Sequence, residues 1–243
     1  MTFELNLNDA LYTFTVVKKP RQRRIIVTAK APNTFLVTAP RSVRKKDIID
    51  VIETHQEQLL RMKPPVDFKE AFIDGAEIPV FDEVLTLYQL PSKRSTHRKG
   101  TKVYFYGVQD DAQFKKRTHA WLKAQLASEI ERLVSKYQHA IKGIDLTELT
   151  MRYQYMKTKF GSCQPTKKRM SFNLELVHYP KVFTEYIFLH EVSHLAHADH
   201  SKAFYAFFET LCPNHKTYRR AINSLRKRLL NEGFEGLIDR DKA

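Results

Sequence analysis

The first part of the chain alternates short apolar runs with turn-forming residues, a pattern typical of β-strands. β-branched and aromatic residues dominate three runs, at 12–17, 24–28 and 34–39, and prolines separate them. The segment 42–62 differs: Ser42 can cap a helix whose isoleucines and leucines recur at helical spacing. The pattern therefore predicts three strands followed by one helix.

The strand pattern returns beyond this helix and then gives way to long helical periodicity. Three further strands are expected within 72–80, 84–88 and 102–106. An amphipathic stretch then runs from Asp111 to Ile141, ahead of Gly143. We therefore predict a β-rich N-terminal region, residues 1–108, and a second domain, residues 109–243.

The second domain is expected to combine a small sheet with several helices. Strand-like alternation at 149–155 and 171–177 lies on either side of a turn at 161–165. Helices are predicted at about 184–194, at 202–211 with Ser201 as its cap, and at 218–230. The fold class is therefore α+β.

Composition adds an expected location and a class of partner. The first ten residues lack the basic and apolar runs of a signal peptide, no stretch approaches a membrane span, and the two cysteines are too few for a disulfide framework. We expect a cytoplasmic protein with no membrane partner. The formal net charge of +14 is suited to nucleic acid or nucleotides, although a solvated surface that keeps the protein soluble is the favoured explanation.

A histidine cluster gives the chain its candidate chemistry. His190-Glu191-Val192-Ser193-His194 is followed by His200. Residues four apart share one face of a helix, so His190 and His194 can bind one zinc ion, with Glu191 beside them as a proton acceptor. The spacing predicts a hydrolytic zinc site in which Glu191 activates water.

A third metal ligand has to come from another part of the chain. His197 lies about 4.5 Å farther along an unbroken helix than His194, which is too far for one shared ion. His200 reaches the ion if the helix ends and Ser201 begins a new one, and we favour it. Asp199, Glu209 and Glu232 remain alternatives at this point.

With these motifs in hand, the chain resembles the YgjP-like (WLM-related) zinc metallopeptidases, a family related to the SprT and Spartan-type proteases. The resemblance covers nearly the whole chain. It depends on Lys157-Thr-Lys-Phe-Gly-Ser-Cys163, the strand with Asn173, the segment 190–201 and the aromatic pair 204–205. Two positions depart from the family pattern: Lys159 stands where Arg is usual, and Phe160 where Trp is usual.

The resemblance implies a zincin-like helical metallopeptidase domain with a small antiparallel sheet. It assigns the zinc ligands to His190, His194 and His200 and the catalytic glutamate to Glu191. The implied substrate is a protein or peptide. We expect Lys157 and Lys159 to contact substrate, and the strand near Asn173 to offer an edge to an extended chain.

Two other functions fit the same residues. A zinc-dependent nucleotide or phosphoester hydrolase would hold phosphates with basic residues near the turn, and would use the same metal chemistry on another bond. These basic residues are Lys157, Lys159, Lys167, Lys168 and Arg169. A non-catalytic, basic nucleic-acid-binding module with a structural zinc is the third hypothesis, which an open fourth ligand position disfavours.

Overall fold

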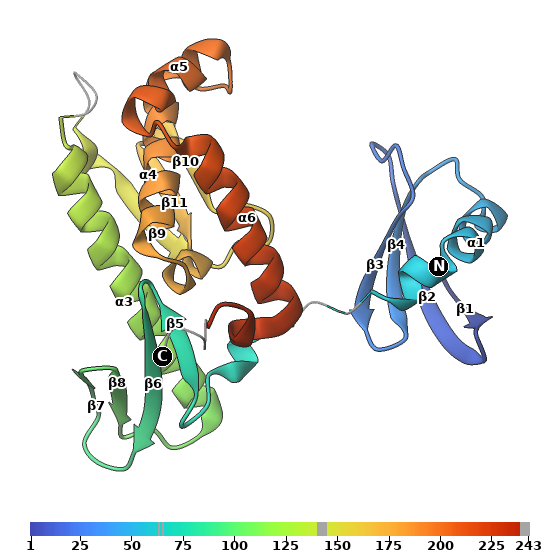
Figure 1. Cartoon of the computed structure of the whole chain (residues 1–243), viewed down its shortest axis with the longest axis horizontal. Coiled ribbons are helices and arrows are strands. Elements are labelled where there is room, and N and C mark those ends of the chain that lie inside the picture. Colours follow the sequence, from blue (N-terminus) through green and yellow to red (C-terminus); the bar gives the residue numbers. More distant parts are fainter. Residues whose placement is uncertain (63, 65, 140–144, 239–243) are drawn as a thin grey trace. The chain divides into compact units, whose positions relative to one another are not determined.

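The computed structural model describes residues 1–62, 64, 66–139 and 145–238 (Figure 1). The chain divides into two compact units, Met1–Val66 (unit 1) and Asp67–Ala243 (unit 2). The boundary expected at residue 108 lies inside unit 2. The α+β class predicted from the sequence is confirmed, because sheets and helices both form the cores of the chain.

Unit 1 is a four-stranded sheet covered on one face by two short helices. Its strands are β1 (Thr2–Leu7), β2 (Ala10–Lys19), β3 (Ile26–Ala31) and β4 (Thr34–Pro40), in the order β1-β2-β4-β3, and its helices are α1 (Lys45–Thr54) and α2 (Gln56–Leu60). Alternate residues such as Phe14 and Val37 are buried in one core with Ile48 and Ile52. The three predicted strands are confirmed, β1 was not predicted, and the helix expected at 42–62 is two helices that meet at His55.

A second sheet opens unit 2. The 3-10 helix η1 (Phe68–Ala71) precedes β5 (Glu77–Val80), β6 (Glu83–Leu90), β7 (Ser95–Lys99) and β8 (Lys102–Tyr106), in the order β5-β6-β8-β7. All five residues of β7 are exposed. Without an apolar alternation this strand could not be predicted from its sequence.

Helix α3 (Asp111–Tyr137) explains why the second sheet belongs to unit 2. Phe105 of β8 packs edge-on against Phe114 of α3, with ring centroids 5.3 Å apart, and both side chains are fully buried. The sheet and the long helix therefore share one core. Asp110 caps α3 by accepting from the backbone N–H of Gln113 at 2.7 Å. The end predicted at Ile141, before Gly143, lies outside the described residues.

The third sheet is small and mixed. Its strands are β9 (Thr150–Gln154), β10 (Gly161–Gln164) and β11 (Arg169–Asn173); β10 pairs antiparallel and β9 parallel with β11. The sheet was expected to be antiparallel throughout. The segment 161–165 was expected to be a turn, but Gly161–Gln164 is a strand whose one partner is β11.

Helices complete unit 2 around this sheet. After the short 3-10 turns η2 (Leu146–Glu148), η3 (Pro165–Lys167) and η4 (Leu174–His178) come α4 (Lys181–Ala196), α5 (Lys202–Leu211), α6 (His215–Glu232) and η5 (Gly233–Gly236). The three helices predicted here are confirmed, although α4 and α6 each begin three residues earlier than expected. Among the described residues, no helix combines the length and apolarity needed to cross a bilayer.

Candidate active site

Helix α4 carries the first half of the histidine cluster. Nine of its residues are buried, so the helix is held from several sides within unit 2. His190 and His194 are one helical turn apart, with ring centroids separated by 5.0 Å. The spacing therefore places both imidazoles on one face, as the motif predicted.

A sharp reversal after α4 brings the third histidine back to this face. The helix ends at Ala196, and His197 has an extended backbone. Asp199 Oδ1 accepts from the N–H of Ser201 at 3.2 Å, and Ser201 then caps α5. As a result, His200 Nε2 lies 3.1 Å from His190 Nε2.

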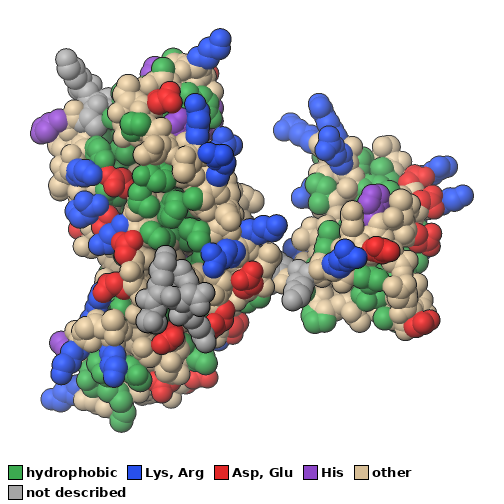
Figure 2. Space-filling model, in the orientation of Figure 1, with side chains coloured by type: hydrophobic (Ala, Val, Ile, Leu, Met, Phe, Trp, Pro, Cys, Tyr) green, Lys and Arg blue, Asp and Glu red, His purple; other side chains and the backbone are tan. Residues whose placement is uncertain are grey.

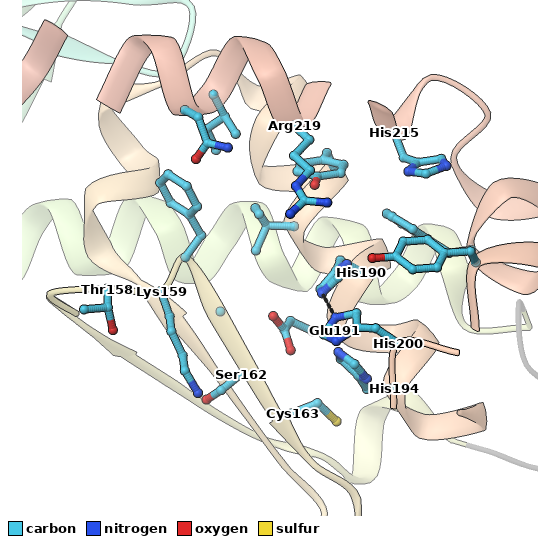
Figure 3. Close-up of a pocket in the computed structure, with 18 of the residues that line it drawn as sticks. Thr158, Lys159, Ser162, Cys163, His190, Glu191, His194, His200, His215 and Arg219 are labelled. Carbon is cyan, nitrogen blue, oxygen red and sulfur yellow. Dashed lines mark hydrogen bonds between the residues drawn. The ribbon is translucent and has the colours of Figure 1, made fainter. Parts of the chain in front are cut away.

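Three imidazoles thus converge from two sides of the turn (Figure 3). One ring nitrogen from each of His190, His194 and His200 can be chosen so that all three lie within 4.8 Å of one another. The fully buried ring of Phe204 packs against all of them, with centroid distances of 5.1, 4.6 and 4.9 Å. This apolar floor fixes the orientation of the cluster.

The cluster favours neutral imidazoles with free lone pairs. His194 Nδ1 lies 3.2 Å from the His197 carbonyl oxygen, which can only accept, so Nδ1 carries the proton and Nε2 is left as an acceptor. Burial, reinforced by the neighbouring histidines, lowers the pKa of His190 to about 3. Burial also lowers the pKa of His194. Unprotonated nitrogens of this kind are ligands for a divalent metal.

Glu191 is held at the edge of the cluster in an enclosed position. Glu191 is 5% exposed, and burial raises the pKa of its carboxyl group to about 8. The charge of Lys159 and the backbone N–H of Cys163 act in the opposite direction. A carboxyl group in these surroundings can exchange a proton near neutral pH, which is the property required of a general base.

The histidines and Glu191 line a pocket of about 650 Å³. Its walls come from the loop before β10, from β10 itself and from α4, α5 and α6. Glu191 is the one carboxylate among the lining residues, whereas Lys159 and Arg219 supply cations. Figure 3 shows these two side chains entering from different elements, Lys159 beside β10 and Arg219 from α6.

The structure separates the three residues expected to contact substrate. Lys159 lines the pocket, but Lys157 does not. Asn173 is fully buried, and its side chain binds the backbone of Met156 and Lys159. The prediction that the strand near Asn173 presents an edge is wrong, because β11 is the central strand; the edge beside the pocket is β10.

The alternative third ligands lie elsewhere. Asp199 is committed to the turn at Ser201, and Glu209 lies 3.7 Å from Lys216. Among the described residues, neither they nor Glu232 join the histidines in a group of potential metal ligands. The His197 ring is directed at Phe207, with centroids 5.8 Å apart.

Sequence reasoning missed the interactions that hold the loop before β10. Arg226 of α6 donates to the carbonyl oxygens of Met156 and Lys157, and its guanidinium lies over the ring of Phe160 at 4.7 Å. Its Nε is 3.1 Å from Oε1 of the buried Glu175. Arg226 is more than fifty residues from each of these partners along the chain, so no local motif indicates the arrangement.

The histidine cluster has the dimensions of a metal site. Two nitrogens that each lie about 2.05 Å from one tetrahedral ion are about 3.3 Å apart. The 3.1 Å between the Nε2 atoms of His190 and His200 is close to that spacing. Three ring nitrogens around one point, with an open pocket on the remaining side, therefore fit a divalent metal with one exchangeable position.

Comparison with protein-family models relates the chain to metallopeptidases. The model of the YgjP-like metallopeptidase domain matches residues 23–225. The chain is similar to two crystal structures of metallopeptidase zymogens: abylysin of Pyrococcus abyssi (18% identity, TM-score 0.34) and jannalysin of Methanocaldococcus jannaschii (17%, 0.31). These matches cover 40% and 41% of this chain and 95% and 96% of the other chains.

No curated protein matches the chain. The family model, by contrast, spans most of it, including the whole histidine cluster and the loop before β10. A catalytic metal and a peptide substrate are properties that this family implies. The chain belongs to the YgjP-like metallopeptidase family.

Proposed function

We propose that this protein is a zinc-dependent peptidase in which His190, His194 and His200 hold the metal and Glu191 is the general base. The observation that carries the proposal is the convergence of three ring nitrogens within 4.8 Å beside a buried carboxyl group in an open pocket. Three nitrogen ligands and no thiolate or carboxylate suit zinc, and they leave its fourth position to water or substrate.

The metal and the chain have separate tasks in the proposed reaction. A bound zinc ion supplies a Lewis acid that polarises the peptide carbonyl and makes water acidic. Glu191 takes the proton of the attacking water and afterwards gives it to the leaving amine. Its burial suits this exchange because a desolvated carboxyl group binds and releases protons near neutral pH.

The peptide is expected to lie along β10. This strand has one paired neighbour, β11, and Gly161, Ser162 and Cys163 all line the pocket. An extended substrate could pair with the free backbone edge, which would place its carbonyl groups beside the histidines. The side chains of Lys159 and Arg219 form no hydrogen bond or ion pair with the described residues, so they favour a substrate with a carboxylate near the scissile bond.

The competing phosphoester hydrolase has weaker support. Of the five basic residues expected to hold phosphates, only Lys159 lines the pocket. Lys168 is 2.5 Å from Glu148, and Arg169 is hydrogen-bonded to Gln164. A structural zinc site is also disfavoured, because such sites usually have four protein ligands and this cluster has three.

The decisive experiment offers zinc-loaded protein an unfolded protein, peptides with Asp or Asn beside the scissile bond, and nucleoside triphosphates. We expect peptide cleavage, faster for Asp than for Asn. The Glu191→Gln variant should bind as much zinc by elemental analysis and turn over about 10²–10⁴-fold more slowly. Equal activity in this variant, or hydrolysis of triphosphates alone, would overturn the proposal.

A cytoplasmic location, suggested by the unpaired Cys163 and Cys212, stays a prediction.

A further inference from the structure

Unit 1 contains a long segment of purely positive charge that the proposed peptidase reaction does not use. Between Asp9 and Asp47 the chain has ten Lys or Arg residues and no Asp or Glu. Nine of the ten fall into two short segments, 18–24 and 41–46. Such a distribution leaves one part of the unit without the mixed charges of an ordinary solvated surface.

The topology of the sheet brings the first segment to one end of unit 1. β2 and β4 are parallel neighbours, with Lys18 opposite Ala39 and Lys19 opposite Pro40. β3 runs antiparallel to β4 and begins at the same end, with Ile26 opposite Thr38. The loop from β2 to β3, which contains Arg21, Arg23 and Arg24, therefore lies at the carboxyl ends of β2 and β4.

The second segment leaves β4 at that same end. Arg41, Arg44, Lys45 and Lys46 follow β4 directly and lead into α1. The two segments touch, because Lys18 Nζ donates to the carbonyl oxygen of Arg41 at 3.4 Å. In Figure 2, Lys and Arg side chains gather at the upper end of this unit. We name the nine cations of 18–24 and 41–46 the basic end.

These cations are exposed and almost entirely unneutralised. All nine side chains are classed as exposed. Among the described residues, the one ion pair of the basic end joins Arg44 to Asp47, with 3.2 Å between Nη2 and Oδ1. The other eight cations form no ion pair with the described residues, and like charges at one end of the unit repel one another, so a polyanion that neutralises them binds favourably.

The chemistry of the two segments favours phosphates of a nucleic acid over a membrane. A membrane-binding loop presents apolar side chains beside its cations. Here Val43 in the second segment and Ile25, directly after the first, pack against the core of unit 1. Val17 and Ile26 are 40% and 51% exposed, but they lie on the strands and not at the tips. Five of the nine cations are arginines, whose planar forks bind phosphate oxygens in pairs.

We propose that the basic end of unit 1 binds the phosphate backbone of a nucleic acid, without reading its sequence. The basic end lies in unit 1, whereas the pocket is built wholly from unit 2, so this inference is independent of the proposed peptidase reaction. Phosphate contacts alone give affinity that depends steeply on salt and little on sequence.

The test measures the anisotropy of fluorescein-labelled duplex DNA titrated with the full-length protein at several salt concentrations. Its main variant replaces Arg21, Arg23 and Arg24 by Gln. A matched variant replaces three exposed cations of α6 in unit 2, Arg220, Lys227 and Arg228, by Gln, with the same change in net charge. A third variant replaces Lys45 and Lys46 by Gln. It tests the second segment of the basic end even if the loop variant folds poorly.

We expect the basic-end triple variant to lower the magnitude of the salt slope, d log K/d log[salt], by about 2 to 3, since each duplex phosphate contact contributes about 0.9. The α6 variant should change the slope much less, and two unrelated DNA sequences should bind alike. Equal effects of the two triple variants would overturn the proposal. A protein that does not bind DNA would also overturn it. So would a protein that binds phosphatidylserine vesicles more tightly than DNA and keeps this vesicle binding in the basic-end triple variant.

Discussion

Gly161 and Glu191 approach each other so closely that no side chain fits between them: a Cβ atom on Gly161 would lie 2.6 Å from Glu191 Oε1. The φ angle of Gly161 is not positive, so glycine is needed here for space and not for backbone conformation. The edge strand β10 can therefore lie directly against the carboxyl group, and the N–H of Cys163 can reach it.

Replacing Gly161 by Ala should displace Glu191 and slow the reaction. We expect a loss of about 1–3 kcal/mol in the free energy of unfolding from overpacking. We also expect a clear drop in kcat, with zinc content unchanged because the three atoms nearest to the new methyl group all belong to Glu191 and none to a histidine. Urea denaturation, peptide cleavage and elemental analysis measure the three quantities.

A double-mutant cycle identifies the clash as the cause. In a Glu191→Ala background the new methyl group meets no carboxylate, so Gly161→Ala should then cost much less stability. An equal cost in both backgrounds would mean that the methyl group disturbs β10 itself. In that case the contact between the two residues would not explain the glycine.

The third ligand of the proposed metal site can be tested by removing imidazoles one at a time. His200→Ala should weaken zinc binding by more than the roughly 10–100-fold that loss of an outer-shell partner costs. His197→Ala is the matched control, because its ring packs on Phe207 and lies outside the cluster. Competition with a chromophoric chelator gives the affinities. Equal losses in the two variants would contradict the assignment.

Asp199→Ala tests the remaining alternative in the same assay. Asp199 accepts from the N–H of Ser201, so we expect only a modest loss of zinc affinity through a looser turn. Zinc binding that fails in this variant while it survives in His200→Ala would make the carboxylate the ligand.

Local patterns predicted the parts of the structure that depend on neighbours in sequence. The spacing of His190 and His194 determines their shared face, and Ser201 caps α5 as its residue type suggests. The same reasoning found most helices and strands. It failed for β7, whose five exposed residues carry no apolar alternation. It also placed the boundary between the two parts at residue 108 and not at Val66, because the β5–β8 sheet shares its core with α3.

The missing parts of the candidate site depend on contacts that are distant in sequence. Asn173 was expected near a substrate edge, but the pairing of β11 with both β9 and β10 buries it. Nothing local indicates that Arg226 reaches the loop at Met156, or that Gly161 meets Glu191. These relationships arise only when the strands pair and α6 packs.

The pair of Arg226 and Glu175 should be essential to the loop before β10. The residue Glu175 is 4% exposed and Tyr179 donates to its Oε1, so removing the guanidinium leaves a buried carboxylate with one fewer partner. Arg226→Met should therefore cost about 3–5 kcal/mol of unfolding free energy. It should also raise KM, since the loop that carries Lys159 loses its anchors.

Two companion variants separate charge from geometry. Arg226→Lys keeps the charge but cannot reach Glu175 and two carbonyl oxygens at once, so an intermediate loss is expected. The double variant Glu175→Gln with Arg226→Met removes both charges and should recover part of the stability. If Arg226→Met were as stable as the unaltered protein by urea denaturation, the pair would have no structural role.

His178 should make the stability of unit 2 depend on pH. Its ring is 1% exposed, Nδ1 donates to the Pro79 carbonyl oxygen at 2.8 Å, and Nε2 has no partner. Burial lowers its pKa to about 4, below the ordinary value near 6.5. Between these two pKa values the His178 ring is protonated in the unfolded chain but not in the folded protein. The free energy of unfolding therefore falls as the pH drops from about 6.5 to about 4.

The shift corresponds to roughly 3 kcal/mol across that window, none of which is lost above it. Urea denaturation at pH 5 and pH 7 should show a smaller difference for His178→Phe than for the unaltered protein. The phenyl ring suits the neighbouring Phe68, Phe72 and Phe234, and its cost from the lost bond to Pro79 is the same at both pH values. His97→Gln, at an exposed position of β7, is the control. An unchanged difference in His178→Phe would mean that other histidines account for the acid sensitivity.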